Sequence, residues 1–414
     1  MRHRVHERIF WLSCIAISFF QPVFGRIVPV FIGIMVLNWL IDWRFLYFIK
    51  RMKFEKDRIY TFSFASIYIL YLAGLIHTVN FDYGWFDLEI KLSLFIFPLV
   101  FATSPWPLFS PHRTMLILWA FAAGCISGAL ILLGHASINE YSFGVSGTFY
   151  YMKLAWFFHP SYLSIYYNFA IGILILKLLQ TNHDYPVRSL LLVGSILFLA
   201  VMIILLSSKA GLLTLALIIL LAAFYSWKRM KLKWQGLIIL GSGVFLFVLG
   251  YWLVPVAFSR ISAISHAVTS QPEKGRVQSE SNADRMAVWV TAIEIIEKNY
   301  LFGVGTGDVK DALMEGYKKN RLLPAYEHKF NAHNQYLQTF VTLGLGGFLV
   351  LVAILLLPAL RALKSRQDLY FIFLLMFALN ILFESMLEIQ AGVVFYAFFN
   401  ALLFSVKING DPVS

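Results

Sequence analysis

Long, nearly uninterrupted apolar runs recur along the whole chain and leave few folds open to it. The segments 59–77, 114–134, 160–179 and 189–206 each have about the length that an α-helix needs to cross a bilayer. Their apolar residues are continuous rather than alternating with a period of two, which excludes the strands of a membrane barrel. Charged residues make up only 14% of the 414 residues, whereas soluble proteins have about 25%. We therefore expect an all-α polytopic integral membrane protein.

The same pattern predicts about twelve transmembrane helices. They cover residues 9–21, 27–42, 59–77, 88–104, 114–134, 160–179, 189–206, 210–227, 236–256, 335–360, 369–388 and 391–407. The first follows a basic segment like that of a signal peptide, but no small-residue cleavage site comes after it, so we expect it to be retained. The chain then divides into an N-terminal membrane bundle (1–256), a large polar loop with short helices (257–334) and a C-terminal membrane bundle (335–414).

Lysine and arginine are distributed unevenly between alternate connections, and this distribution predicts the orientation. One set of connections carries Arg44, Lys50, Arg51, Lys53, Lys56, Arg58, Arg113, Arg188, Lys228, Arg229, Lys231, Lys233, Arg361, Lys364 and Arg366. The opposite set carries little more than Arg26, Lys91, Lys153 and Lys209. The positive-inside rule then places both termini in the cytoplasm and the loop 257–334 in the periplasm of a bacterial inner membrane. The net charge of +12 follows from this bias and does not indicate nucleic-acid binding.

Within the loop, apolar residues at helical spacing predict a helix over about 283–298, with Asn282 as its cap. A second short helix is expected over 309–320, capped by Asp308. The turn between them, Gly303-Val304-Gly305-Thr306-Gly307, superficially resembles a phosphate loop. It lacks the Lys-Ser/Thr ending and the preceding strand, so a tight interhelical turn is the better interpretation.

Two residues of the loop are the leading candidates for catalysis, His333 and Arg285. His333 immediately precedes the span at 335, where the helix N-terminus disfavours imidazolium and attracts anions, so a neutral histidine there can act as a base. Arg285 lies in the first turn of its helix, against the helix dipole, and its planar guanidinium suits phosphate binding. The alternatives are a histidine that only hydrogen-bonds among lipid head groups, and an arginine paired with Asp284 or Glu280.

Further cations and polar residues lie on the same outer face. Lys209, between two spans, and Arg260, in the loop, are candidate ligands of an anionic group. The alternatives are a lysine that extends to lipid phosphate and an arginine that is solvated at the surface. His159 precedes Pro160, a favourable first residue of a helix. Glu384 and Glu388 share one face of the predicted span 369–388, where carboxylates are functional candidates.

The sequence offers no metal-binding, nucleotide-binding or disulfide framework. HExxH and CxxC motifs are absent, and Cys14 and Cys125 both fall within predicted spans. We therefore expect no cofactor and no metal. The cationic, histidine-bearing surface that remains suits group transfer from a lipid diphosphate, in which arginine and lysine neutralise the leaving group in place of a metal.

Four segments together resemble one family. SSKAGLL at 207–213, NADRMAVW at 282–289, LFGVGTGD at 301–308 and AHNQYLQTFVTLGLGG at 332–347 match the order, spacing and topology of the O-antigen ligase and polymerase family. The resemblance implies a GT-C-like membrane fold and an inverting, metal-independent transfer of a glycan from undecaprenyl diphosphate on the periplasmic face.

The resemblance also implies roles for individual residues. His333 matches the essential histidine of the family, a proposed base for the acceptor hydroxyl. Arg285 matches the loop arginine that holds donor phosphate, and Lys209 stands where many members have arginine, so the charge is kept and the bidentate geometry is lost. The remaining assignments come from the residues themselves and not from the resemblance. Arg260 is expected to assist at the diphosphate, and the acceptor or glycan is expected to contact His159, Tyr162, Asn334 and Trp289.

Three functions remain open from the sequence. The first is a ligase that transfers the glycan to a lipid A–core acceptor. The second is a polymerase that joins repeat units on the lipid, with an oligosaccharyltransferase acting on protein as a variant. The third, of a different class, is a transporter of lipid-linked glycan, but transporters have paired halves and polar groups near the bilayer midplane, whereas here the polar residues gather on one outer face. The oligomeric state is open.

Overall fold

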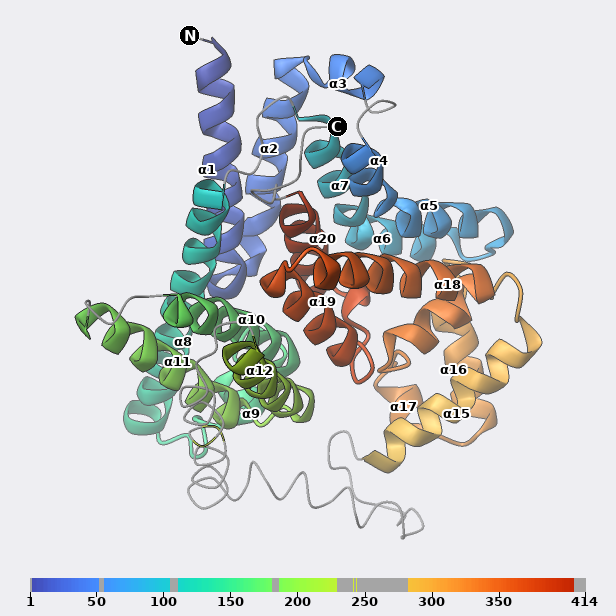
Figure 1. Ribbon diagram of the computed structural model, residues 1–414. Coiled ribbons are helices and arrows are strands. Elements are labelled where there is room, and N and C mark those ends of the chain that lie inside the picture. Colours follow the sequence, from blue (N-terminus) through green and yellow to red (C-terminus); the bar gives the residue numbers. More distant parts are fainter. Residues whose placement is uncertain are drawn as a thin grey trace.

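The computed structural model describes residues 2–51, 56–104, 111–180, 186–228 and 282–405, together with residues 241 and 243. Every regular element in these ranges is a helix, as expected (Figure 1). Seven helical segments of the described chain are long and apolar enough to cross a membrane, and three shorter apolar helices accompany them. The protein is thus a polytopic helical membrane protein, whereas the number of twelve spans stays a prediction. The predicted span 236–256 and Arg260 fall outside the described ranges.

In the described ranges, the first part of the chain forms eleven α-helices of very different lengths. Short 3-10 turns at Gly25–Ile27 and Gly74–His77 lie between some of them. They are α1 (Arg2–Val23), α2 (Val28–Asp42), α3 (Phe45–Arg51), α4 (Lys56–Ser63), α5 (Ser66–Ala73), α6 (Phe81–Lys91), α7 (Ser93–Thr103), α8 (Pro111–Phe143), α9 (Tyr151–Leu154), α10 (Pro160–Leu179) and α11 (Pro186–Leu206). The helix α12 (Lys209–Lys228) follows them.

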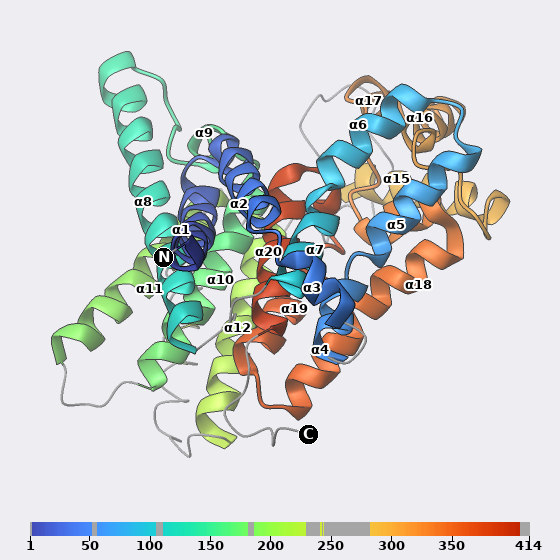
Figure 2. The same cartoon turned by 90° about the horizontal axis from the view of Figure 1, so that it is seen from above.

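The second part contains the loop helices and the C-terminal helices. They are α15 (Asn282–Lys298), α16 (Val309–Lys319), α17 (Leu323–Glu327), α18 (Gln335–Lys364), α19 (Asp368–Asn380), the 3-10 turn η4 (Met386–Glu388) and α20 (Gln390–Phe404). In both views α15, α16 and α17 lie together beside α18, and α8 to α12 form a separate group on the other side of α19 and α20 (Figures 1 and 2).

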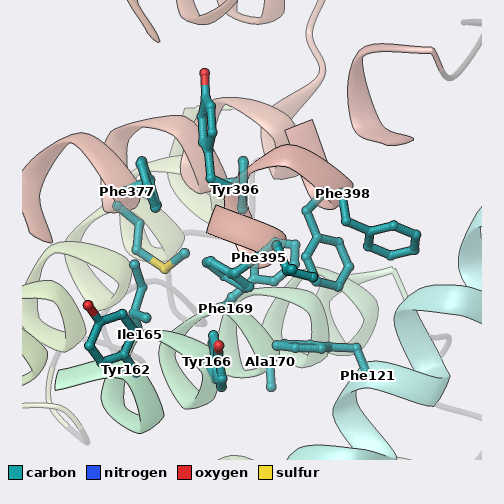
Figure 3. Close-up of a cluster of buried hydrophobic side chains, with 14 of the residues drawn as sticks. Phe121, Tyr162, Ile165, Tyr166, Phe169, Ala170, Phe377, Phe395, Tyr396 and Phe398 are labelled. Carbon is teal, nitrogen blue, oxygen red and sulfur yellow. The ribbon is translucent and has the colours of Figure 1, made fainter. Parts of the chain in front are cut away.

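The helix α10 is buried on all its faces and anchors the membrane core. It packs against α8, α11, α12 and α19, and nearly all of its side chains are apolar, as in a helix surrounded by other helices. Aromatic rings join it to α8 and α20: the ring of Phe399 lies 4.8 Å from that of Phe121 and 4.9 Å from that of Phe169. Tyr166 and Phe395 continue this contact at 4.9 Å, and the cluster fills the space between the helices (Figure 3).

Some predicted spans differ from the helices observed. The span predicted over 369–388 is wrong in its second half, because α19 ends at Asn380 and the chain turns before η4. Polar residues cause the break: the Asn380 amide donates to Thr214 Oγ1 at 2.7 Å, and Glu384 and Ser385 find partners outside their own segment. The span predicted over 88–104 is divided between α6 and α7, and α8 continues nine residues beyond the predicted end at 134.

The loop helices have a core of their own. Val288 and Ala292 of α15 pack with Leu313 and Tyr317 of α16, and Val341 of α18 completes the cluster. The helices predicted over 283–298 and 309–320 are confirmed as α15 and α16. Asp308, however, does not cap α16 with its side chain; its carboxylate accepts from the backbone N–H groups of Val79 (2.8 Å) and Asn80 (2.7 Å).

The glycine-rich turn holds these helices against a kink in α18. Gly344 interrupts α18 with φ 64° and ψ −159°, which frees backbone groups of the preceding turn. The N–H groups of Val304 and Gly305 donate to two of those carbonyls, of Val341 (2.9 Å) and Thr342 (3.0 Å). Since its N–H groups are used in this way, the segment is a packing turn between helices, as expected, and not a phosphate loop.

Candidate functional site

The N-terminus of α18 fixes the position of His333. Asn334 is the cap residue, and its Oδ1 accepts from the backbone N–H groups of Tyr336 (2.9 Å) and Leu337 (3.2 Å). His333 adopts a left-handed backbone with φ 47°, and its N–H donates to Asn331 Oδ1 at 2.9 Å. A non-glycine residue in this conformation is uncommon, and such residues gather at functional sites. Here the conformation accompanies a side chain that is only 10% exposed.

The partner of the imidazole is Glu384, in the turn between α19 and η4. His333 Nδ1 lies 3.4 Å from Glu384 Oε1. The other carboxylate oxygen, Oε2, accepts from Ser161 Oγ at 3.3 Å and lies 3.9 Å from His159 Nδ1. An ionised carboxylate only accepts hydrogen bonds, so His333 Nδ1 is the donor in this contact. No described residue pairs with Nε2, which is buried.

Arg285 reaches the same turn from α15. Its Nη1 donates to the backbone carbonyl of Phe383 at 3.0 Å, next to Glu384. Burial by itself raises the pKa of the Glu384 carboxyl. The hydrogen bond from His333 and the charges of His159 and Arg285 outweigh burial, and the pKa lies below its ordinary value. Glu384 is therefore an ionised carboxylate that contacts two histidines and lies next to the carbonyl that Arg285 binds.

A second buried network supports this arrangement from α6. The Lys91 ammonium is fully buried and lies 2.5 Å from Asp87 Oδ1 and 2.9 Å from Glu388 Oε2. Glu388 Oε1 accepts from Gln335 Nε2 at 2.9 Å, and Gln335 Oε1 accepts from the N–H of Leu387 at 2.7 Å. Gln335 is the first residue of α18, two positions after His333. The ion pairs thus tie η4 to the helix end that presents the histidine.

A cavity of about 350 Å³ opens beside His159. Its wall is largely aromatic, with Phe157, Phe158, Tyr162 and Tyr166, and Arg26 contributes a charge from the turn before α2. The Tyr162 hydroxyl is buried, and no residue in the described ranges hydrogen-bonds to it. Such an apolar wall with a few polar groups is typical of a ligand-binding cavity.

The structure brings some of the predicted site residues together and separates others. His333 and His159 meet at Glu384, and Arg285 binds the backbone carbonyl of the preceding residue, Phe383. Tyr162 lines the neighbouring cavity. Asn334 is engaged as the helix cap.

The roles assigned to Trp289 and Lys209 stay predictions. Trp289 packs against the core of the loop helices, away from the exposed surface expected of a sugar platform. Lys209 is the first residue of α12, whose first turn rests on α10: Gly211 O accepts from Asn168 Nδ2 at 2.9 Å. In the described part of the chain, no group of three or more His, Cys, Asp or Glu residues is arranged to hold a metal ion.

Two members of this site have no role assigned to them from the sequence. Glu384 was recognised only as a carboxylate within an apolar run, because nothing in the sequence relates it to a histidine 51 residues earlier. Lys91 was visible as a cation on the side with few cations. Its contact with Glu388, 297 residues away, depends on the packing of α6 against η4.

One comparison with known proteins bears on the site. Residues 194–352 match the family model described as O-antigen ligase. The matched region contains Lys209, Arg285 and His333, whereas His159 and Glu384 lie outside it. None of the curated proteins compared with the chain matches it.

Proposed function

Because residues 194–352 match the O-antigen ligase family, we propose that the chain is a member of it and transfers a glycan from undecaprenyl diphosphate to an acceptor hydroxyl on the periplasmic face of the inner membrane. The family implies ligase- or polymerase-type transfer of a lipid-linked glycan in a membrane. Beyond this family-level function, the proposal specifies the lipid donor, the side of the membrane on which transfer takes place and the residues that carry it out.

The observation that carries the proposal is the contact between His333 and Glu384. The carboxylate accepts the Nδ1 proton and thereby selects the tautomer in which Nε2 can accept another. This is the role of the carboxylate in a hydrolase triad, where it orients the histidine and stabilises the imidazolium. An acceptor hydroxyl hydrogen-bonded to Nε2 would lose its proton to His333 as its oxygen attacks the anomeric carbon.

The bond from the anomeric carbon to the diphosphate oxygen breaks as the new glycosidic bond forms, with inversion at that carbon. The leaving diphosphate then needs positive charge. Arg285 supplies it in this proposal. Its Nη1 donates to Phe383 O, which helps to fix the guanidinium, and the planar fork of a guanidinium suits bidentate binding of phosphate. Lys209, at the start of α12, and Arg260 are the further proposed ligands.

We assign the acceptor side to His159 and Tyr162. Both line the cavity next to Glu384, and the aromatic wall of that cavity offers faces on which a sugar ring can stack. We propose a lipid A–core sugar as the acceptor, and transfer to that acceptor is the reaction of a ligase. A polymerase of the same family would use the same residues with a lipid-linked glycan as acceptor, and the experiment below separates the two.

The surface polysaccharide of the native host tests the proposal. A deletion strain is complemented with the wild-type protein or with His333→Ala, and His328→Ala serves as the matched control because His328 is exposed in the same loop. Membrane levels of each variant are measured first. A ligase predicts that unmodified lipid A–core remains and that long glycan accumulates on undecaprenyl diphosphate in the deletion and His333→Ala strains. Cores that carry single repeat units identify a polymerase, and a normal ladder with His333→Ala would contradict the catalytic role.

A further inference from the structure

A groove of about 490 Å³ lies between α1 and α8, near the N-terminal end of α1. This end of α1 is on the opposite side of the molecule from α9 and α17 (Figure 1). The groove is separate from the His333 site and shares no residue with the cavity beside His159. Its lining residues are Arg4, Glu7, Arg8, Trp11, Leu12, Ile15, Arg113 and Leu116.

The groove changes from charged to apolar along the two helices. The six lining residues of α1 follow each other at steps of three, one, three, one and three, so they form a single stripe along one face. The charged members come first, and Leu12 and Ile15 follow about one to two turns later. The helix α8 repeats this order with Arg113 and then Leu116. A ligand that fills the groove must have an anionic end and an apolar end.

The close packing of α1 and α8 elsewhere explains why the space is there. At Gly124 and Gly128 of α8, an added Cβ would lie 2.2 Å from Phe19 O and 2.6 Å from Pro22 O, so these backbones are in contact near the C-terminal end of α1. At the other end, Trp11 and Arg113 stand between the helices, with the guanidinium carbon 5.0 Å from the ring centroid. The large side chains of Trp11 and Arg113 hold the two helices apart near the N-terminal end of α1 and leave a groove there. Near the C-terminal end of α1, the glycines let the helices touch, so no groove forms.

The charge of the groove is not balanced by its own residues. Three arginines face one carboxylate, and Glu7 is paired with Arg113. Arg4 and Arg8 are exposed and form no ion pair with another described residue. Leu12 and Leu116 are 64% and 47% exposed, as expected of side chains that face lipid. A phosphodiester between Arg4 and Arg8 would be neutralised there, and its acyl chains would continue over the leucines.

We propose that this groove binds an anionic glycerophospholipid of the cytoplasmic leaflet. The N-terminus of the chain is on the cytoplasmic side in the topology expected from the positive-inside rule, so a phospholipid of that leaflet has its phosphate at the level of the arginines. The proposal is independent of the glycan-transfer function. The alternative is that the arginines are simply solvated at the end of the helix. Arginines of that kind would not bind a lipid in preference to an inorganic anion.

Native mass spectrometry of the full-length protein tests the proposal. The delipidated protein in detergent is titrated with phosphatidylglycerol and with phosphatidylethanolamine of the same acyl chains. The variants are Arg4→Gln/Arg8→Gln, which leaves the Glu7–Arg113 pair intact, and Arg188→Gln, which removes an exposed arginine of α11 as the control. Unfolding temperatures without lipid establish that each variant is folded.

We expect phosphatidylglycerol to bind more tightly than phosphatidylethanolamine. The double variant should weaken phosphatidylglycerol binding by about 30-fold, the equivalent of about 1 kcal/mol per arginine, and the control should weaken it by less than about twofold. Equal binding of the two lipids, or an equal loss in Arg188→Gln, would overturn the proposal. Competition by glycerol 3-phosphate or inorganic phosphate at the same concentration as the lipid would identify a free-anion site and also overturn it.

Discussion

The imidazole of His333 and the carboxylate of Glu384 face each other across 3.4 Å between Nδ1 and Oε1, although 51 residues separate them in the chain. The two side chains come from two different connections, one before α18 and one after α19, and α18 packs against α19. The contact supplies what a lone interfacial histidine lacks, a fixed tautomer and a counter-charge. It also explains how a histidine can take the part that a carboxylate base has in many glycoside-cleaving enzymes, with the carboxylate behind it.

The first prediction concerns the pH dependence of stability. The pKa of Glu384 lies below its ordinary value of 4.5, so its ionised form stabilises the fold at pH above 4.5. This contribution is lost as the pH falls through the lower pKa of the folded state. We expect the unfolding temperature of the detergent-solubilised protein to fall more steeply than that of Glu384→Gln as the pH drops below 4.5. Glu89→Gln, at an exposed carboxylate of α6, should keep the steep slope, and a wild-type slope in Glu384→Gln would contradict the role of this carboxylate.

The second prediction concerns Lys91. Its replacement by methionine leaves Asp87 and Glu388 buried without a counter-charge, which should lower the free energy of unfolding by about 3–5 kcal/mol. The measurement is the unfolding midpoint in mixed micelles. Because Glu388 also binds Gln335, transfer activity should fall with stability.

A second substitution separates charge from packing at Lys91. Adding Asp87→Asn to Lys91→Met removes one of the two stranded charges and should restore part of the stability. Lys318→Met, at an exposed lysine of α16, is the control and should change the midpoint little. An unchanged unfolding midpoint in Lys91→Met would show that the buried ion pairs do not stabilise the position of η4.

The third prediction concerns the kink of α18. At Gly344 the backbone has φ 64°, and an added Cβ would lie 2.3 Å from Leu301 O. Gly344→Ala should therefore destabilise the protein by about 1–3 kcal/mol and detach the turn at 300–305, measured as faster amide exchange of that segment. Gly346→Ala is the matched control, because nothing lies within 4 Å of its added Cβ. Equal exchange in the two variants would argue against the docking of the turn into the kink.

The sequence predicted the elements that are encoded locally. Apolar runs of sufficient length predict the membrane helices, and the span predicted to begin at 335 coincides with the start of α18 at Gln335. Helical spacing predicts α15 and α16, and the missing phosphate-loop residues identify the glycine turn as a packing turn. Each of these signals lies within one segment of the chain.

The rest depends on contacts between distant segments. The run 369–388 is apolar enough to predict one helix, and its break after Asn380 is stabilised by Thr214 of α12, which hydropathy does not reveal. The pairing of Glu384 with His333, rather than with solvent, follows from the packing of α18 on α19. The number of membrane spans stays a prediction for a simpler reason, since the predicted ninth span lies outside the described residues.

The most direct test is a double-mutant cycle on transfer by the purified protein. The rate of transfer from a lipid-linked glycan to the acceptor is measured for the wild type, His333→Ala, Glu384→Ala and the double variant, with His328→Ala as control. If the two residues act as one unit, His333→Ala should lower the rate by about 10²–10⁴-fold and Glu384→Ala by about 10–100-fold. The double variant should then be no more than about twofold slower than His333→Ala. Multiplicative losses in the double variant, or wild-type transfer by His333→Ala, would contradict the account.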